Sequence, residues 1–361
     1  AIASETSVDV QVHGVGGVPD QATAVVLNVT VTNTSAPGFV TVFPAGTELP
    51  LASSVNVIAA GQTRATTVTV PIGADGKVSV YSYGSADVLF DVAGYFVASD
   101  VPVAAGRFVP LTPQRLFDTR PSEPSPGPKG VVEAATEIDV PVLGEAGVPA
   151  DGVSAVVLNV TGTGALAPGF ITVYPGGAEL PLASSVNLAA VGDTAANLAI
   201  VPVGDDGSIS LYASHGTHML ADVTGYVTDA SAPVASTGMF VPLDPVRVFD
   251  TRPEESEVPG PKGFVGAGGS ITVDVAGTSG IPDDAVGVVL TVTGVSGPPG
   301  FVTAWDTGST MPLASTMNFS HQPLDTRANG AVLRLGDGGR LDFYSAFGSH
   351  ILADASGYLL G

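Results

Sequence analysis

Two nearly identical segments concentrate charged side chains that could bind or orient a partner. They read RLFDTRP at 115–121 and RVFDTRP at 247–253. If each segment is extended, Asp118 and Arg120 lie on one face, because side chains alternate along a strand. A guanidinium can bind a carboxylate through two parallel hydrogen bonds. The pattern predicts an arginine–aspartate clamp that fastens a strand or linker to a domain. The alternative is a ligand or partner site built on the same arginines.

The clamp hypothesis extends to a set of recurring charged residues. The two DTRP segments contribute Arg115, Asp118, Arg120, Arg247, Asp250 and Arg252. An aspartate also precedes each Gly-Tyr pair, at Asp91, Asp222 and Asp354. We expect these three aspartates to be hydrogen-bonded structural groups, with an arginine of a DTRP segment as a possible partner. A carboxylate that binds a cation or a sugar is the alternative.

The histidines do not predict catalysis or a metal site. His215 and His218 are three residues apart, so on a strand they point to opposite faces and make a poor metal pair. A triad of Ser214, His218 and Asp222 can be assembled on paper, but no nucleophile elbow or oxyanion motif accompanies it. We therefore expect no catalytic, cofactor-binding or metal-binding residues, and no enzyme activity.

Three further sets of residues have mainly structural interpretations. The acidic pairs 205–206 and 283–284 lack the dense D-x-D-x-D spacing of a calcium loop. A recurring amide, at Asn56, Asn187 and Asn318, is expected to cap loop backbone. The aromatic residues available to a sugar site are Tyr81, Tyr83 and Trp305, and packing in a core or sheet is the simpler expectation.

The composition narrows the choice of partners. The 361 residues include 34 acidic and 12 basic side chains, a formal net charge of −22, and no cysteine. Such a surface repels nucleic acid and anionic lipid. No stretch is long and apolar enough to span a bilayer. We expect neither nucleic-acid binding nor membrane insertion.

The sequence repeats itself three times. AVVLNVTVTNTSAPGFVTVFP begins at Ala24, AVVLNVTGTGALAPGFITVYP at Ala155, and GVVLTVTGVSGPPGFVTAWD at Gly287. A repeat of about 130 residues is the size of a complete domain rather than of a solenoid rung. The sequence predicts three homologous domains, at 1–100, 101–231 and 232–361.

Alternating and β-branched runs predict an all-β fold. In AVVLNVTVT, valine and leucine alternate with residues for the opposite face, and Pro-Gly and Asp-Gly pairs punctuate the runs. The turns at 73–77 and 204–208 are expected to be tight hairpins. Each domain is predicted to be a β-sandwich of Greek-key or jelly-roll character, with a closed β-barrel as the alternative.

The DTRP segment occurs only twice among the three domains. Either the first domain lacks a leading segment or the last lacks a trailing one, and the period alone does not decide. A domain without this strand has an unpaired sheet edge, which invites strand addition from another chain. A head-to-tail contact of that kind produces a filament or array.

The ordered motifs resemble a known family. PLTPQRLFDTRP, GVPADGVSAVVLNVT, APGFITVYP, LASSVNL and LADVTGY together resemble the "RLLDTR…LNVT…DVAGY" repeat of secreted actinobacterial proteins. The resemblance implies a secreted or cell-surface location and a unit that starts with the DTR segment and ends at Gly-Tyr. By that rule, domain 1 lacks its leading segment. The resemblance implies no catalytic role.

Together, these observations predict a non-catalytic, secreted structural protein that forms or decorates an extracellular filament, surface layer or stalk through self-association. The alternative is a cell-surface adhesin or carbohydrate-binding module for cell-wall or host glycans, in which three similar domains would provide avidity.

Overall fold

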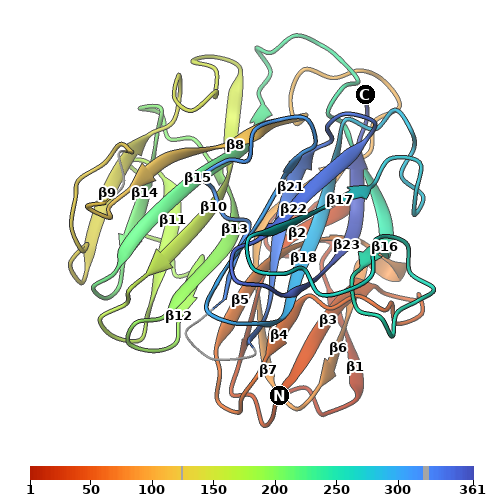
Figure 1. Ribbon diagram of the computed structural model, residues 1–361. Coiled ribbons are helices and arrows are strands. Elements are labelled where there is room, and N and C mark those ends of the chain that lie inside the picture. Colours follow the sequence, from red (N-terminus) through yellow and green to blue (C-terminus); the bar gives the residue numbers. More distant parts are fainter. Residues whose placement is uncertain (123–124, 320–324) are drawn as a thin grey trace.

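The computed structural model describes residues 1–122, 125–319 and 325–361, and their regular structure is almost entirely β (Figure 1). Unit 1 contains β1 (Thr6–Gln11), β2 (Ala22–Thr32), β3 (Gly38–Pro44), β4 (Val55–Val57), β5 (Arg64–Pro71), β6 (Lys77–Tyr83) and β7 (Asp87–Val97). Unit 2 contains β8 (Phe108–Asp118), β9 (Thr136–Pro141), β10 (Val153–Thr163), β11 (Gly169–Pro175), β12 (Val186–Leu188), β13 (Thr194–Pro202), β14 (Ser208–Ala213) and β15 (His218–Thr228). Unit 3 contains β16 (Phe240–Asp250), β17 (Gly269–Asp274), β18 (Gly287–Gly297), β19 (Gly300–Asp306), β20 (Met317–Phe319), β21 (Asp325–Arg334), β22 (Arg340–Ser345) and β23 (His350–Leu359).

Units 2 and 3 are eight-stranded jelly rolls. In unit 2 the sheets have the orders β13-β10-β15-β8 and β12-β11-β14-β9, and in unit 3 β16-β23-β18-β21 and β17-β22-β19-β20. All the pairings are antiparallel, and the chain passes repeatedly between the two sheets. This is the strand order of two Greek keys wrapped into a sandwich. The predicted all-β sandwich fold is confirmed, and the sheets do not close into barrels.

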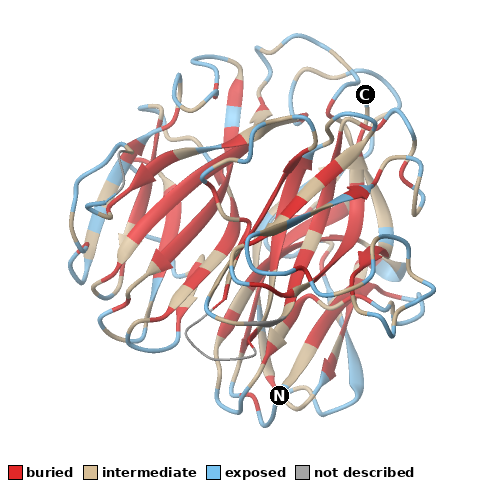
Figure 2. Ribbon diagram, in the orientation of Figure 1, coloured by how far each residue is buried: buried red, intermediate tan, exposed pale blue. Residues whose placement is uncertain are grey.

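Each sandwich encloses its own aliphatic core. In unit 2, Val156, Leu158 and Val160 of β10 are fully buried between the sheets, together with Ile171 and Leu211 from the facing sheet. Figure 2 shows this burial along the central strands, with exposed residues concentrated in the loops. Because side chains alternate along a strand, the apolar runs read from the sequence fill these cores.

Unit 1 has only seven strands. Its second sheet has the order β5-β2-β7, so β7 lies at an edge. In the other units the corresponding strand is covered by the strand that contains the DTRP segment: β8 pairs with β15, and β16 pairs with β23. The DTRP strand therefore belongs to the unit that follows it, and the first unit has none among the residues that the structure describes.

The expectation of hairpins at 73–77 and 204–208 is wrong. The first connects β5 to β6, and the second connects β13 to β14, which belong to different sheets of their sandwich. Asp75 takes a left-handed conformation with φ of 57° inside the short 3-10 turn η1 (Ala74–Gly76). An Asp-Gly pair suits any tight turn with positive φ, so it does not by itself predict that the flanking strands pair.

The three units pack in a cyclic order. The amide of Asn28 in unit 1 donates to the carbonyl of Ser184 in unit 2 at 2.6 Å, and Asn159 in unit 2 donates in the same way to Ser315 in unit 3. Unit 3 returns to unit 1 through an ion pair of 2.9 Å between Arg64 and Asp325. The molecule is thus a ring of three related sandwiches. No helix in the described part of the chain is long and apolar enough to cross a membrane.

Candidate functional site: arginine–aspartate clusters and the unit junctions

The first DTRP segment forms a buried ionic cluster with the strand beside it. Arg115 lies opposite Asp222 in the β8–β15 ladder and forms ion pairs with both Asp222 and Asp118. Asp118 is fully buried and also accepts hydrogen bonds from the Arg120 backbone at 2.8 Å and guanidinium at 2.7 Å. The structure thus brings Arg115, Asp118, Arg120 and Asp222 together around the end of β8.

The second segment repeats this geometry in unit 3. Arg247 forms ion pairs with Asp354 and, at 2.7 Å, with Asp250. Arg252 donates to Asp250 through its backbone at 3.0 Å and its guanidinium at 2.6 Å. Two independent copies of one arrangement indicate that the sequence pattern itself specifies the cluster. In both copies, strand β8 or β16 ends at the aspartate, three residues before the proline.

Each cluster has two further contacts that the charge pattern did not predict. Lys129 donates to the carbonyl of Asp118 at 2.7 Å, and Lys262 donates to that of Asp250 at 2.7 Å. Thr119 contacts the ring of His218 at 3.2 Å. The equivalent contact, between Thr251 and His350, is also 3.2 Å. The signal was present in the sequence: a Pro-Lys-Gly follows both DTRP segments, and His218 and His350 occupy equivalent positions at which unit 1 has Asp87.

Burial and ion pairing oppose each other in these clusters. Burial raises the pKa of Asp222 to about 6, although Arg115 favours its charged form, and burial raises the pKa of Asp354 in the same way. Burial alone would also raise the pKa of Asp118, but the hydrogen bonds and charge of Arg120 and the charge of Arg115 hold it below the ordinary value. The clusters fasten strands at a desolvation cost, as buried ion pairs do.

One arginine of each cluster, Arg115 or Arg247, also reaches the next unit around the ring. Arg115 in unit 2 donates to the carbonyl of Leu313 in unit 3 at 3.4 Å. Arg247 in unit 3 donates to the carbonyl of Leu51 in unit 1 at 3.0 Å. These arginines therefore connect a strand, its own sandwich and the neighbouring sandwich.

Asp91 occupies the corresponding position on β7 but makes no ion pair with any residue that the structure describes. Its pKa is raised by burial, and no nearby cation counters that effect. Asp91 is therefore the one predicted aspartate that the structure does not bring together with an arginine.

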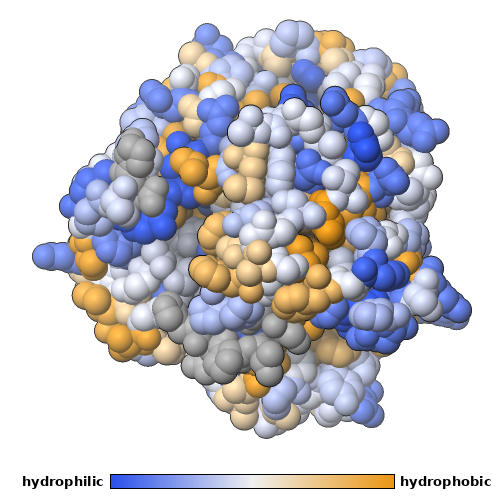
Figure 3. Space-filling model, viewed as in Figure 1, coloured by the Kyte–Doolittle hydropathy of each residue, from blue (hydrophilic) through white to orange (hydrophobic). Residues whose placement is uncertain are grey.

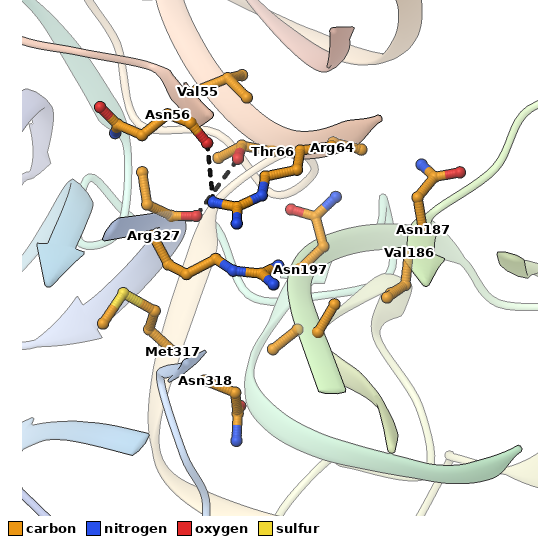
Figure 4. A pocket seen from close by; sticks show the side chains of 14 residues that line it. Val55, Asn56, Arg64, Thr66, Val186, Asn187, Asn197, Met317, Asn318 and Arg327 are labelled. Carbon is orange, nitrogen blue, oxygen red and sulfur yellow. Dashed lines mark hydrogen bonds between the residues drawn. The ribbon is translucent and has the colours of Figure 1, made fainter. Parts of the chain in front are cut away.

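A small pocket lies where the three units meet, and Figure 4 shows side chains from all three turned toward it. Its volume of about 20 Å³ is room for roughly one water molecule. Arg64 donates to the carbonyl of Asn56 at 3.0 Å, and Arg327 pairs with Asp325 at 2.8 Å. Burial and the nearby Arg327 lower the pKa of Arg64 to about 10. Around this pocket, Arg64 of unit 1 and Arg327 of unit 3 both pair with Asp325, and we call this group the ionic junction.

The recurring amides lie around this junction. Asn56 and Asn187 each donate to the serine hydroxyl three residues earlier, at 3.1 and 3.2 Å, and Asn318 accepts from Ser315 at 2.9 Å. For Asn56 and Asn187 the expected capping of loop backbone is therefore wrong, because both amides donate to side chains. A serine three residues before each asparagine recurs in the sequence and would have predicted this contact.

The candidate triad is not assembled. The hydroxyl of Ser214 accepts a hydrogen bond from the backbone N–H of Phe170 at 2.7 Å and contacts His215 at 3.2 Å, while His218 and Asp222 bind the DTRP segment. Among the described residues there is no group of three or more histidine and acidic side chains able to hold a metal ion. Asp206 instead accepts from the backbone and hydroxyl of Ser208 at 3.0 and 2.7 Å, as in a polar turn.

A pair of aromatic rings recurs on β-strands of each unit. The centroid distances are 6.0 Å for Phe39–Tyr81, 6.3 Å for Phe170–Tyr212 and 6.0 Å for Phe301–Tyr344. Tyr83 stacks on Phe39 at 5.5 Å, whereas Trp305 is buried. The surface otherwise mixes hydrophilic and hydrophobic residues, as the face in Figure 3 shows.

No protein-family model matches the chain, and no curated protein matches it. A solved structure titled as the atomic structure of Sulfolobus Turreted Icosahedral Virus matches with 12% identity, a TM-score of 0.19, and coverage of 98% of this chain and 83% of that one. One titled for the triple jelly roll fold and turret assembly of an archaeal virus matches with 10% identity, a TM-score of 0.19, and coverage of 98% and 82%. At these TM-scores neither likeness supports an argument about this chain.

Proposed function

We propose that the protein is a non-catalytic structural component of an extracellular or cell-surface assembly, of the secreted actinobacterial repeat type that its motifs resemble. One observation carries the proposal: the charged residues that recur in the repeat fasten strands and join neighbouring sandwiches. Arg115 and Arg247 each contact two aspartates and a carbonyl of the next unit. Side chains used in this way stiffen a building block.

Negative-stain electron microscopy combined with light scattering tests the proposal. The purified full chain is examined over a wide concentration range, with and without calcium. Ordered filaments or sheets are the expected result. A monodisperse monomer under every condition would contradict self-assembly by this chain alone.

The recurring aromatic pairs favour a second candidate, a carbohydrate-binding module. A phenylalanine and a tyrosine lie close together in every unit, and their rings are only partly buried. Aromatic faces pack against sugar rings, and three weak sites on one ring would act together. A glycan array tests this candidate. Binding that falls when Tyr81, Tyr212 and Tyr344 are replaced by alanine would support it.

A further inference from the structure

A groove lies between units 1 and 2 and extends to β7, the edge strand of its sheet. Its volume is about 320 Å³. Asp91 and Ala93 line it from β7, and Tyr174, Ser184 and Ile200 are among the residues that line it from unit 2. Leu89, Tyr95 and Val97 on β7 are 52, 46 and 47% exposed, which is high for apolar strand residues. Strand β7 therefore combines an unpaired edge, exposed apolar side chains and one carboxylate that lines the groove.

The chain itself shows what fills this position in the other two units. There the corresponding edge is covered by β8 or β16, whose arginine lies opposite Asp222 or Asp354. In both cases the arginine also donates to the carbonyl of a leucine in the next unit, Leu313 or Leu51. By the repeat, the matching leucine for the groove is Leu182. Asp91 lines the groove, and Leu182 lies between Pro181 and Ala183, which also line it.

A glycine provides a second, independent observation. A Cβ at Gly225 would lie 2.4 Å from Phe108 and 2.7 Å from the carbonyl of Val109, both on β8. A Cβ at Gly357 would meet β16 in the same way, 2.6 Å from the carbonyl of Val241. At Gly94 on β7 a Cβ would have nothing within 4 Å. The close approach that requires glycine in units 2 and 3 has no counterpart here, and the space for a strand is open.

We propose that this groove binds an extended polypeptide segment of the β8 pattern, which adds as an antiparallel strand to β7 and places an arginine between Asp91 and the Leu182 carbonyl. The segment belongs to a partner outside residues 1–361. The inference rests on the proposed assembly role for its biological meaning, because it identifies the joint. Its test does not depend on assembly.

One residue refines the expected segment. Ala221 and Ala353 lie opposite Phe117 and Phe249, and these rings fill the cores of units 2 and 3. In unit 1 the matching position is Phe90, which packs against the core itself. A docked strand therefore needs a small residue where β8 has Phe117, since a second ring would overfill the space.

Binding of a synthetic peptide to the full chain tests this proposal. The probe is residues 107–121 with Phe117→Ala, labelled for fluorescence anisotropy, and a scrambled peptide of equal charge controls for attraction to an acidic protein. In the protein, Asp91→Asn is expected to weaken binding about 10- to 100-fold, because a charge-assisted bidentate pair is lost. Gly94→Ala is expected to weaken it comparably, by obstructing the strand. The matched control Asp20→Asn removes an exposed charge outside the groove and is expected to change nothing.

The site is located by hydrogen–deuterium exchange, in which the probe is expected to protect backbone amides of 87–97 and to leave β15 and β23 unchanged. Because a protein variant can misfold, Arg115→Ala within the peptide provides the same test from the other side, with the same expected loss. Equal binding of the scrambled peptide, no binding up to about 1 mM, or binding insensitive to Asp91→Asn, Gly94→Ala and Arg115→Ala would each overturn the proposal. Binding of the probe by a chain that never assembles supports this site and counts only against the assembly role.

Discussion

At the scale of single residues, the raised pKa of Asp222 predicts how the unfolding free energy depends on pH. Its pKa is about 6 in the folded chain, against about 4 when unfolded, so the folded chain binds more protons between these values. This difference in pKa raises the unfolding free energy by up to about 3 kcal/mol below pH 4. The stabilisation is lost as the pH rises through 6. Asp222→Asn is therefore expected to flatten the fall in unfolding free energy between pH 4 and 6, measured by urea denaturation. An unchanged slope would contradict the assignment.

Asp118 and Asp250 act in the opposite direction. Burial would raise the pKa of each, but the adjacent arginines hold both below the ordinary value. Their contribution to stability is present above pH 4 and is lost as the pH falls further. The two effects occupy different pH ranges, so the Asp222→Asn variant separates them.

Removing the central arginine is expected to cost more than removing any surface arginine. Arg115→Ala leaves the buried carboxylates of Asp118 and Asp222 without their shared cation, which costs about 3–5 kcal/mol of unfolding free energy. Arg340→Ala is the control, because among the described residues that side chain donates only to the carbonyl of Asp337, at 2.9 Å, and a change within about 0.5 kcal/mol is expected. Equal urea midpoints for the two variants would rule out the clamp.

At the scale of elements, the glycine before each tyrosine distinguishes a covered edge from a free one. Gly225→Ala forces a methyl group against β8 and is expected to destabilise the protein by about 1–3 kcal/mol. At Gly94 on β7 an added methyl group has no atom within 4 Å, so the melting temperature of Gly94→Ala is expected to match that of the unmodified chain. Thermal unfolding followed by circular dichroism checks both. A similar loss in the two variants would mean that the edges are alike.

Much of the fold could be predicted because the repeat and the alternation are local features of the sequence. The apolar runs around Val156 and Leu158 predicted buried strands, and those strands form the core. Which strands pair with each other could not be predicted. The turns at 73–77 and 204–208 join strands of different sheets, and a turn sequence does not encode which strands pair. The alternation placed Asp118 and Arg120 on one face. The central role of Arg115 in the cluster could not be predicted in this way, because it depends on an irregular register between β8 and β15 that brings Arg115 opposite Asp222.

At the scale of the whole molecule, the ionic junction couples the units. Arg64 pairs with Asp325 at 2.9 Å, and Arg327 approaches Asp193 of unit 2 at 3.5 Å. Replacing both Arg64 and Arg327 by alanine removes these two ion pairs between units. Thermal unfolding is then expected to split into separate transitions, because the three sandwiches are less strongly coupled. Differential scanning calorimetry measures this, with Arg340→Ala as the control. A single sharp transition in the double variant would show that the junction does not couple the units.

The unpaired position on β7 also has a mechanical consequence. The junctions between units 2 and 3 and between units 3 and 1 are each crossed by an arginine from a strand anchored in a sandwich, whereas no arginine from such a strand reaches Leu182 across the junction between units 1 and 2 in the described part of the chain. Units 1 and 2 are joined by the hydrogen bonds of Asn28 to Ser184 and Asn197, without an arginine of that kind. A force that pulls the units apart is therefore expected to separate units 1 and 2 first, and a strand docked on β7 would brace this junction against the load.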